Sequence, residues 1–332
     1  MIAGRSRASR WPAAAIALAA GCGGTLDAGR DRPHGLLPID ERNPVILAND
    51  NWSDNWSGEY TALLANSGGP PLAGIIVNAT NYWSDLNSNA TGWTKLVTAA
   101  QSSGLARLPP VTASAGAPLV RPADGQVDST VPNNSSGAQL IVRLSRELSL
   151  PLRPLVVLVD TSLTDIADAY LLDHTVVDRV VIVAALGQYA APNGSMTGPN
   201  GDLDAWADWI VAQHFRYVQI STYYDQTGDV TMSQLANLPQ NALGTWMADK
   251  QPNLFKIPTA SDQVTVLSAG LPAFATGVQR AAPDTSAAFQ SGQGPPLLPR
   301  PDGNVWLVTK IAAPLAAARL WQMLLDPATF TH

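Results

Sequence analysis

The chain has 332 residues, of which 46% are hydrophobic and 14% charged, and its formal net charge is −6. This length and hydrophobic content predict a folded chain with a sizeable core and exclude an intrinsically disordered one. The acidic balance provides no basic surface for phosphates, which excludes nucleic acid as a partner. Cys22 is the only cysteine, so no internal disulfide is expected.

The N-terminus has the pattern of a secretory signal peptide, predicted over residues 1–21. Arginines precede a short apolar stretch at 11–20, which is too short to span a bilayer as a helix. The run Ala19-Ala20-Gly21-Cys22 resembles the cleavage box of bacterial lipoproteins, in which the cysteine is acylated, although the usual leucine lies one residue too early. The resemblance predicts export to the cell envelope and a lipid anchor at Cys22 that attaches the chain to the membrane. A plain signal peptide with an incidental cysteine is the alternative.

A tether is predicted over residues 22–43 and a single domain over residues 44–332. Apolar runs alternate with helical patterns along this domain, as in βαβ units. Strands are predicted at Val45–Ala48, Leu72–Val77, Pro110–Ala115, Leu155–Val159, Val180–Val183, Tyr217–Ser221 and Val305–Val308. Helices are predicted at Ser57–Leu64, Thr91–Ser102, Gly137–Leu148, Asp165–Leu172, Ala205–His214 and Pro314–Leu325. We therefore predict an α/β fold with an open, mostly parallel sheet flanked by helices, and a long surface loop or flap over Ala281–Asp302.

Clustered oxygen side chains follow the first predicted strand. Asp50, Asp54 and Asn55 lie within six residues of one another. Carboxylate and carboxamide oxygens suit Ca²⁺ or Mg²⁺, and open α/β sheets bind ligands beyond the carboxyl ends of their strands. The cluster is therefore a candidate cation site. An ordinary turn is the alternative, because Asp, Asn and Ser side chains also bond their own backbone.

The order of these elements and polar loops resembles the inosine/uridine-preferring nucleoside hydrolase family. The first strand of that family ends in D-x-D-x-x-x-D-D, whereas residues 48–55 here read Ala-Asn-Asp-Asn-Trp-Ser-Asp-Asn, so Ala48 and Asn55 replace two acids. The segment Leu155–Ala167 is similar to the family's strand followed by G-P-L-T-N-I-A. Gly201–Asp208 resembles the family's A-E-F-N segment with its downstream Asp.

Two further matches complete the resemblance. Asn81 follows the second predicted strand, as an asparagine does in the family. Ser261-Asp262 matches a late His-Asp segment that opens a helix. An alternative alignment places that segment at residues 312–315 and removes both polar residues.

The resemblance implies a hydrolase that cleaves the N-glycosidic bond of a ribonucleoside or related riboside with a Ca²⁺-bound water. In that scheme Asp50 is both the general base and a metal ligand. The other implied metal ligands are Asn55, the carbonyl of Thr164, and Asp262. The implied binders of sugar hydroxyls are Asp54, Asn81, Asp202 and Asp204.

Departures from the family pattern support an alternative function. Asn55 lacks the charge of the usual acid, which weakens Ca²⁺ binding. Ser261 replaces a histidine that often acts on the leaving nucleobase, and serine is a poor general acid at neutral pH. The alternative is a non-catalytic surface lipoprotein of the same fold that binds a sugar or nucleoside. Asp202, Asp204 and Asp262 can also be read as helix caps. The sequence leaves open whether the chain forms a homo-oligomer.

Overall fold

The structure is a computed structural model of the whole chain. It describes residues 38–39, 42–50, 71–81, 83–105, 107–185, 189–190, 196–197, 203–220, 237–246, 248, 275–292, 294–312, 315 and 325. All of these fall in one compact unit, residues 32–332. None of the helices in these ranges is long and apolar enough to cross a membrane.

Several predicted features lie outside the described residues. They are the signal peptide, Cys22, most of the tether, the helix at Ser57–Leu64 and most of the helix at Pro314–Leu325. The predictions made for these segments therefore stay predictions.

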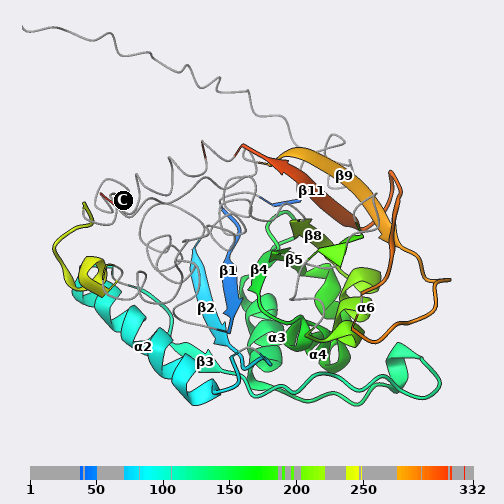
Figure 1. Cartoon of the computed structure of the whole chain (residues 1–332), viewed down its shortest axis with the longest axis horizontal. Coiled ribbons are helices and arrows are strands. Elements are labelled where there is room, and N and C mark those ends of the chain that lie inside the picture. Colours follow the sequence, from blue (N-terminus) through cyan, green and yellow to red (C-terminus); the bar gives the residue numbers. More distant parts are fainter. Residues whose placement is uncertain are drawn as a thin grey trace, which may run out of the picture. The chain divides into compact units, whose positions relative to one another are not determined.

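A nine-stranded, mostly parallel sheet runs through the described part of the chain, in the order β10-β9-β11-β8-β5-β4-β1-β2-β3 (Figure 1). The strands are β1 Val45–Asn49, β2 Leu72–Val77, β3 Val111–Ala113, β4 Leu155–Asp160, β5 Val180–Ala185, β8 Arg216–Ile220, β9 Ala275–Pro283, β10 Leu297–Pro299 and β11 Val305–Ile311. A separate antiparallel pair consists of β6 Tyr189–Ala190 and β7 Met196–Thr197. The predicted fold class is confirmed.

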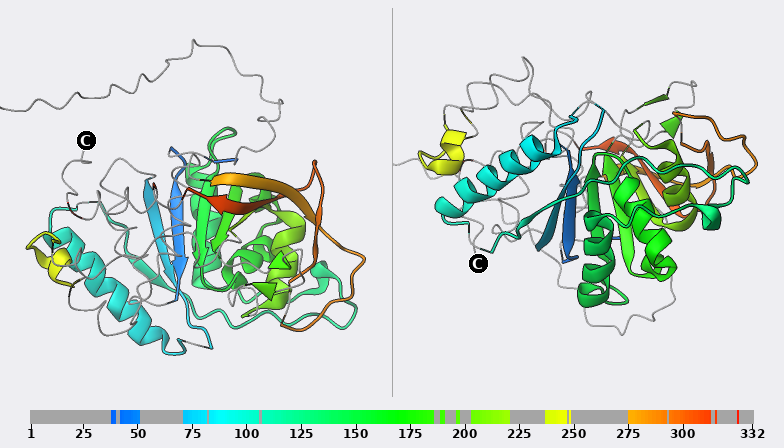
Figure 2. Two further views of the ribbon diagram at one scale, coloured as in Figure 1. Left: turned by 45° about the horizontal axis from the view of Figure 1, so that its top comes forward. Right: turned by 90° about the horizontal axis from the view of Figure 1, so that it is seen from below.

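Helices cover both faces of this sheet, with α2 on one face and α3, α4 and α6 on the other (Figure 2). The helices are α2 Leu86–Ser102, α3 Ser136–Leu148, α4 Thr164–Leu172 and α6 Ala205–His214, with short 3₁₀ turns η1 Val127–Ser129 and η2 His174–Asp178. Trp93 of α2 packs in the same core as Leu47, whereas Ile141 of α3 and Ile166 of α4 pack with Ile46. Every residue of β1 and β4 is buried, as expected for strands covered on both faces.

Most of the predicted elements agree with the structure to within one or two residues, and α2 is longer than predicted. It begins at Leu86, before the predicted Thr91. The carboxylate of Asp85 caps it by accepting a hydrogen bond of 3.0 Å from the Ser88 amide. A good cap therefore extends the helix through a polar stretch that lacks helical periodicity.

The predicted loop over Ala281–Asp302 is wrong at both ends. Strand β9 continues to Pro283, and β10 pairs with it in antiparallel register, Leu297 opposite Pro283. Proline and glycine made this segment look like a loop, but β10 is an edge strand, where a missing backbone N–H is tolerated. The stretch between the two strands is the connection of this hairpin.

Candidate functional site

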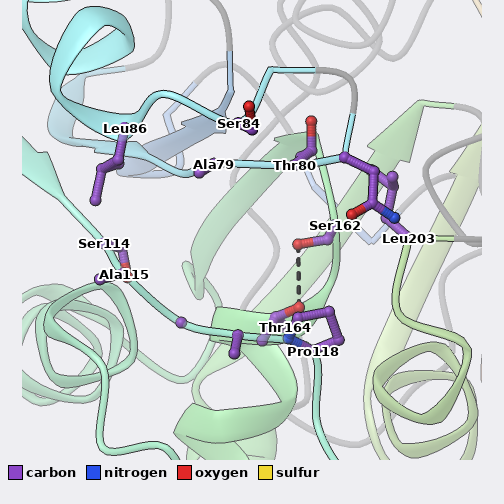
Figure 3. A pocket seen from close by; sticks show the side chains of 13 residues that line it. Ala79, Thr80, Ser84, Leu86, Ser114, Ala115, Pro118, Ser162, Thr164 and Leu203 are labelled. Carbon is purple, nitrogen blue, oxygen red and sulfur yellow. Dashed lines mark hydrogen bonds between the residues drawn. The ribbon is translucent and has the colours of Figure 1, made fainter.

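A cavity of about 310 Å³ lies at the carboxyl ends of the parallel strands. Its walls are the segments that follow β2, β3 and β4, together with Leu203 just before α6. In Figure 3, Thr80 and Ser84 lie on one segment, and Ser114 and Pro118 lie on another. The polar lining consists of Thr80, Asn81, Ser84, Ser114, Ser162 and Thr164, and no charged side chain is among the described residues of the wall. The size and the few polar groups are those of a small-molecule site.

The register of three central strands determines which residues meet at this edge. Asn49, the last residue of β1, pairs with the last residue of β2 and comes opposite the last residue of β4. The next residues in the chain are Asp50, Asn78 and Thr161, which therefore leave the sheet side by side. All three are buried.

Asp50 lies one hydrogen bond from the cavity wall. The residue is 6% exposed, and its carboxylate accepts a hydrogen bond of 2.8 Å from the hydroxyl of Thr80, which lines the cavity. Asn81, the next residue, also lines the cavity and is exposed. A buried carboxylate and an exposed carboxamide thus adjoin the same cavity at the end of β1 and β2.

Thr164 and Asp204 join two helices on the opposite side of the cavity. The Thr164 hydroxyl lies 2.7 Å from Asp204 Oδ2. It also lies 3.1 Å from the Ser162 hydroxyl, and Figure 3 marks this hydrogen bond. Asp204 caps α6 by accepting a hydrogen bond from the Ala207 amide, and its second oxygen accepts another from the Leu119 amide. Burial raises the pKa of Asp204, although these hydrogen bonds oppose the shift. The capping role of Asp204 is confirmed, and its contact with a sugar stays a prediction.

Asp165, in the first turn of α4, is a buried residue that the sequence did not single out as part of a site. Its carboxylate is fully buried and accepts three hydrogen bonds. The donors are the Asn78 amide at 2.9 Å, the Ser114 hydroxyl at 2.8 Å and the Ser135 hydroxyl at 2.6 Å. Burial raises the pKa of Asp165, and the three donors partly offset that shift.

The serines at Asp165 are oriented by the start of α3. Ser114 accepts a hydrogen bond from the Gly137 amide and Ser135 accepts one from the Ala138 amide, so both hydroxyl hydrogens remain available for Asp165. A Cβ at Gly137 would clash with the Asp165 carboxylate, so this close approach requires glycine. Asp165 thus ties together the segments after β2 and β3 and the start of α3. In the sequence, the only sign of this role was an acid within the apolar start of a predicted helix.

Two buried oxygens next to Asp50 have no hydrogen-bond partner in the described part of the structure: Asn78 Oδ1 and Thr161 Oγ1. Leaving such an atom unsatisfied costs about 1–3 kcal/mol. No group of three or more His, Cys, Asp and Glu residues able to hold a metal exists among the described residues. Among the described residues, these two neutral oxygens could serve a cation beside Asp50.

Comparison with known proteins identifies the fold. No family model matches the sequence, and no curated protein matches it. A plant nucleoside hydrolase is 15% identical, with a TM-score of 0.60 over 85% of this chain and 98% of the other. This chain has the nucleoside hydrolase fold. An inosine-uridine preferring nucleoside hydrolase from Bacillus anthracis is 12% identical, with a TM-score of 0.60 over 86% of this chain and 99% of the other. A purine-preferring ribonucleoside hydrolase from Gardnerella vaginalis is 14% identical, with a TM-score of 0.58 over 86% and 99%.

Within this nucleoside hydrolase fold, half of the predicted site residues are described, and they surround one cavity. Asn81 and Thr164 line it, and Asp50 and Asp204 are each hydrogen-bonded to a residue of its wall. The other predicted site residues, Asp54, Asn55, Asp202 and Asp262, lie outside the described residues. The roles predicted for all of them remain predictions.

Proposed function

We propose that this chain is a hydrolase that cleaves the N-glycosidic bond of a ribonucleoside or a related riboside. The observation that carries the proposal is the position of Asp50, a buried carboxylate at the carboxyl end of β1, one hydrogen bond from a cavity of about 310 Å³. The shared fold with enzymes named as nucleoside hydrolases supports the reaction type.

The cavity wall suits a neutral sugar. The hydroxyl groups of Ser84 and Ser162 can both donate and accept hydrogen bonds, as the hydroxyls of a ribose require, whereas the Thr80 hydroxyl donates its hydrogen to Asp50 and can only accept. The carboxamide of Asn81 adds two donors and an acceptor. Since the described wall contains no cationic side chain for a phosphate, an uncharged riboside is the expected substrate class.

Asp50 is proposed as the general base. Its carboxylate takes a proton from the attacking water, and the water oxygen forms a bond to the anomeric carbon. The bond between that carbon and the nucleobase nitrogen breaks, and its electron pair leaves with the nucleobase. The nearby negative charge stabilises the positive, oxocarbenium-like transition state. A Ca²⁺ ion, when bound, would lower the pKa of the water and hold sugar hydroxyls. The proposed ligands are Asp50, Asn55, the Thr164 carbonyl and Asp262.

A screen of ribonucleosides for released reducing sugar tests this function. The wild-type protein is expected to release sugar, and Asp50→Asn is expected to lower turnover by about a thousandfold, because the general base is lost. Asp302→Asn is the matched control, since Asp302 is exposed and lies outside the cavity wall. Unchanged turnover in Asp50→Asn, with the fold verified by circular dichroism, would refute the assignment.

A non-catalytic binding protein is the second candidate function. It is favoured by Ala48, Asn55 and Ser261, which stand where the family pattern has two acids and a histidine. Calorimetry separates the two functions: nucleoside binding without any sugar release indicates the second.

We also propose that the chain is exported to the cell envelope and anchored to the membrane through an acylated Cys22. The proposal rests on the lipoprotein-like run Ala19–Cys22. Cys22→Ser is expected to move the protein from the membrane fraction to the soluble exported fraction. Unchanged fractionation of that variant would contradict acylation.

A further inference from the structure

We propose that Asn78 and Thr161 add two neutral oxygens to the cation site proposed at Asp50, at the ends of three neighbouring strands. The inference deepens the proposed function, because it concerns the ion on which that function depends. It is separable from that function, because it can be tested by metal binding alone.

The strand register brings the three residues together. The Asn78 amide donates a hydrogen bond of 3.0 Å to the Asn49 carbonyl, so the pairing of β2 with β1 continues past the last strand residue. Neighbouring strands lie about 4.8 Å apart, which places Asn78 and Thr161 next to Asp50 on its two sides. The residues two positions earlier, Ala48, Ile76 and Val159, share one core on the α3, α4 and α6 face. Because side chains alternate between faces, Asp50, Asn78 and Thr161 belong to that same face.

The orientation of the Asn78 carboxamide follows from its partner. Asn78 Nδ2 donates to the Asp165 carboxylate at 2.9 Å, and a carboxylate can only accept. The amide nitrogen therefore faces Asp165, and Oδ1 is left as the free end of the side chain. Asn78 is only 2% exposed, and Oδ1 has no partner in the described part of the structure, so it presents a fixed, desolvated acceptor.

Thr161 supplies the second neutral oxygen. The residue is 1% exposed, and Oγ1 has no partner among the described residues. In the G-P-L-T-N pattern matched by residues 161–165, Thr161 stands at the glycine, so its hydroxyl is an addition of this chain. Carboxamide and hydroxyl oxygens are hard donors that suit Ca²⁺.

The ligand set also predicts the strength of the site. This chain lacks the acids expected at Ala48 and Asn55, and it has the buried oxygens of Asn78 and Thr161. The two neutral oxygens replace the missing acids as ligands in number, but they do not replace the negative charge of those acids. Since Ca²⁺ affinity rises with the charge of the ligand set, this site should bind more weakly than one that holds all the acids of the pattern.

Calcium titration of the purified full-length protein by calorimetry tests the site. Thr161→Val, which has nearly the same shape, should raise the Kd for Ca²⁺ by at least about tenfold, as loss of a supporting metal contact does. Thr161→Ser keeps the oxygen and should retain the wild-type Kd. Thr98→Val is the control, because Thr98 is exposed and its hydroxyl bonds only to its own helix. Asp50→Asn should abolish binding.

Thermal unfolding without calcium separates a cation ligand from a structural hydroxyl. If Thr161 Oγ1 serves a cation, Thr161→Val leaves the metal-free Tm unchanged or higher, since an unsatisfied buried hydroxyl is removed. If a buried water satisfies it instead, the variant lowers the metal-free Tm and keeps the wild-type Kd for Ca²⁺, which overturns the inference.

The outcomes also distinguish this inference from the proposed function. Equal Ca²⁺ affinity in Thr161→Val and wild type, or no Ca²⁺ binding by wild type at millimolar metal, overturns the inference, whatever the sugar-release screen shows. Weakened Ca²⁺ binding in Thr161→Val supports it even if no nucleoside is cleaved, in which case the hydrolase function alone fails.

Discussion

The two ends of helix α4 hold carboxylates in opposite ways. At its start, Asp165 is fully buried, accepts hydrogen bonds from neutral donors only, and has a pKa raised chiefly by burial. Just beyond its other end, Asp173 pairs with Arg146 at 2.8 Å and Arg179 at 2.7 Å. Burial would raise the pKa of Asp173, but hydrogen bonds from Thr175 and the two arginines outweigh it and lower the pKa to about 2.

This difference separates the end of the sheet that carries the candidate site from the opposite end. Near Asp165, no described residue partners Asn78 Oδ1 or Thr161 Oγ1, and the wall of the cavity has no cationic side chain among its described residues. Around Asp173, both carboxylate oxygens accept hydrogen bonds, from Thr175 on one side and the arginines on the other. The oxygens of Asn78 and Thr161 lie where a ligand or ion is expected to bind, whereas the ion pairs of Asp173 connect segments at the other end.

The largest effect is expected from Asp165→Ala. This variant tests whether the stability of the segments around the candidate site depends on the Asp165 carboxylate as their common hydrogen-bond acceptor. The variant leaves three buried donors without a partner, so the free energy of unfolding should fall by roughly 3 kcal/mol or more. Urea denaturation measures the change. Asp124→Ala, at an exposed carboxylate with only local hydrogen bonds, is the control. A loss below about 1 kcal/mol would show that the serines and Asn78 find other partners.

A smaller, pH-dependent effect is expected from Asp173→Asn. Because the folded-state pKa of about 2 lies below the unfolded value of about 3.9, the stabilisation by Asp173 is present above pH 4 and is lost as the pH falls toward 2. At pH 5, the free energy of unfolding of the wild type should exceed that of the variant by only about 1 kcal/mol, because solvent screens the ion pairs. The two free energies should converge near pH 2. A difference that does not change with pH would show that packing, and not charge, stabilises this end.

The smallest effect is expected from Arg146→Ala. The Arg146 side chain is 62% exposed, whereas that of Arg179 is 24% exposed. An exposed ion pair contributes little, so Arg146→Ala should lower the free energy of unfolding by less than about 0.5 kcal/mol. Arg179→Ala provides the comparison and should cost more, because its guanidinium also bonds Ser145 and Thr175. Equal losses of unfolding free energy in the two variants would mean that burial does not determine how much each arginine–Asp173 ion pair contributes.

Local pattern predicted the parallel strands well, because a strand buried on both faces reads as an uninterrupted apolar run. Leu72–Val77 was predicted to the residue, and Leu155–Val159 to within one. The hairpin of β9 and β10 was missed because its strands contain prolines: Pro299 lies in β10, at the sheet edge, where proline is tolerated, and Pro283 is the last residue of β9. A local sequence pattern does not predict whether a strand lies at the edge or in the centre of a sheet.

The candidate site was predictable where it depends on strand ends. Asp50 and Asn81 follow parallel strands, and the carboxyl ends of such strands meet at one edge. Asp165 was missed because its partners are remote: Asn78 and Ser114 lie 87 and 51 residues away in the chain. Asp204 was singled out from the sequence, but its hydrogen bond to the Leu119 amide, which spans 85 residues, was not predictable.

The sequence by itself determined a mostly parallel α/β fold and a polar edge that includes Asp50, because apolar periodicity and strand ends are local properties of the chain. Only the tertiary structure decided which oxygens at that edge are satisfied. Asn78 and Thr161 flank Asp50 through strand register, and no described residue offers their side-chain oxygens a hydrogen bond. Hydrogen-bond satisfaction depends on neighbours across the sheet, and those neighbours come from distant parts of the chain.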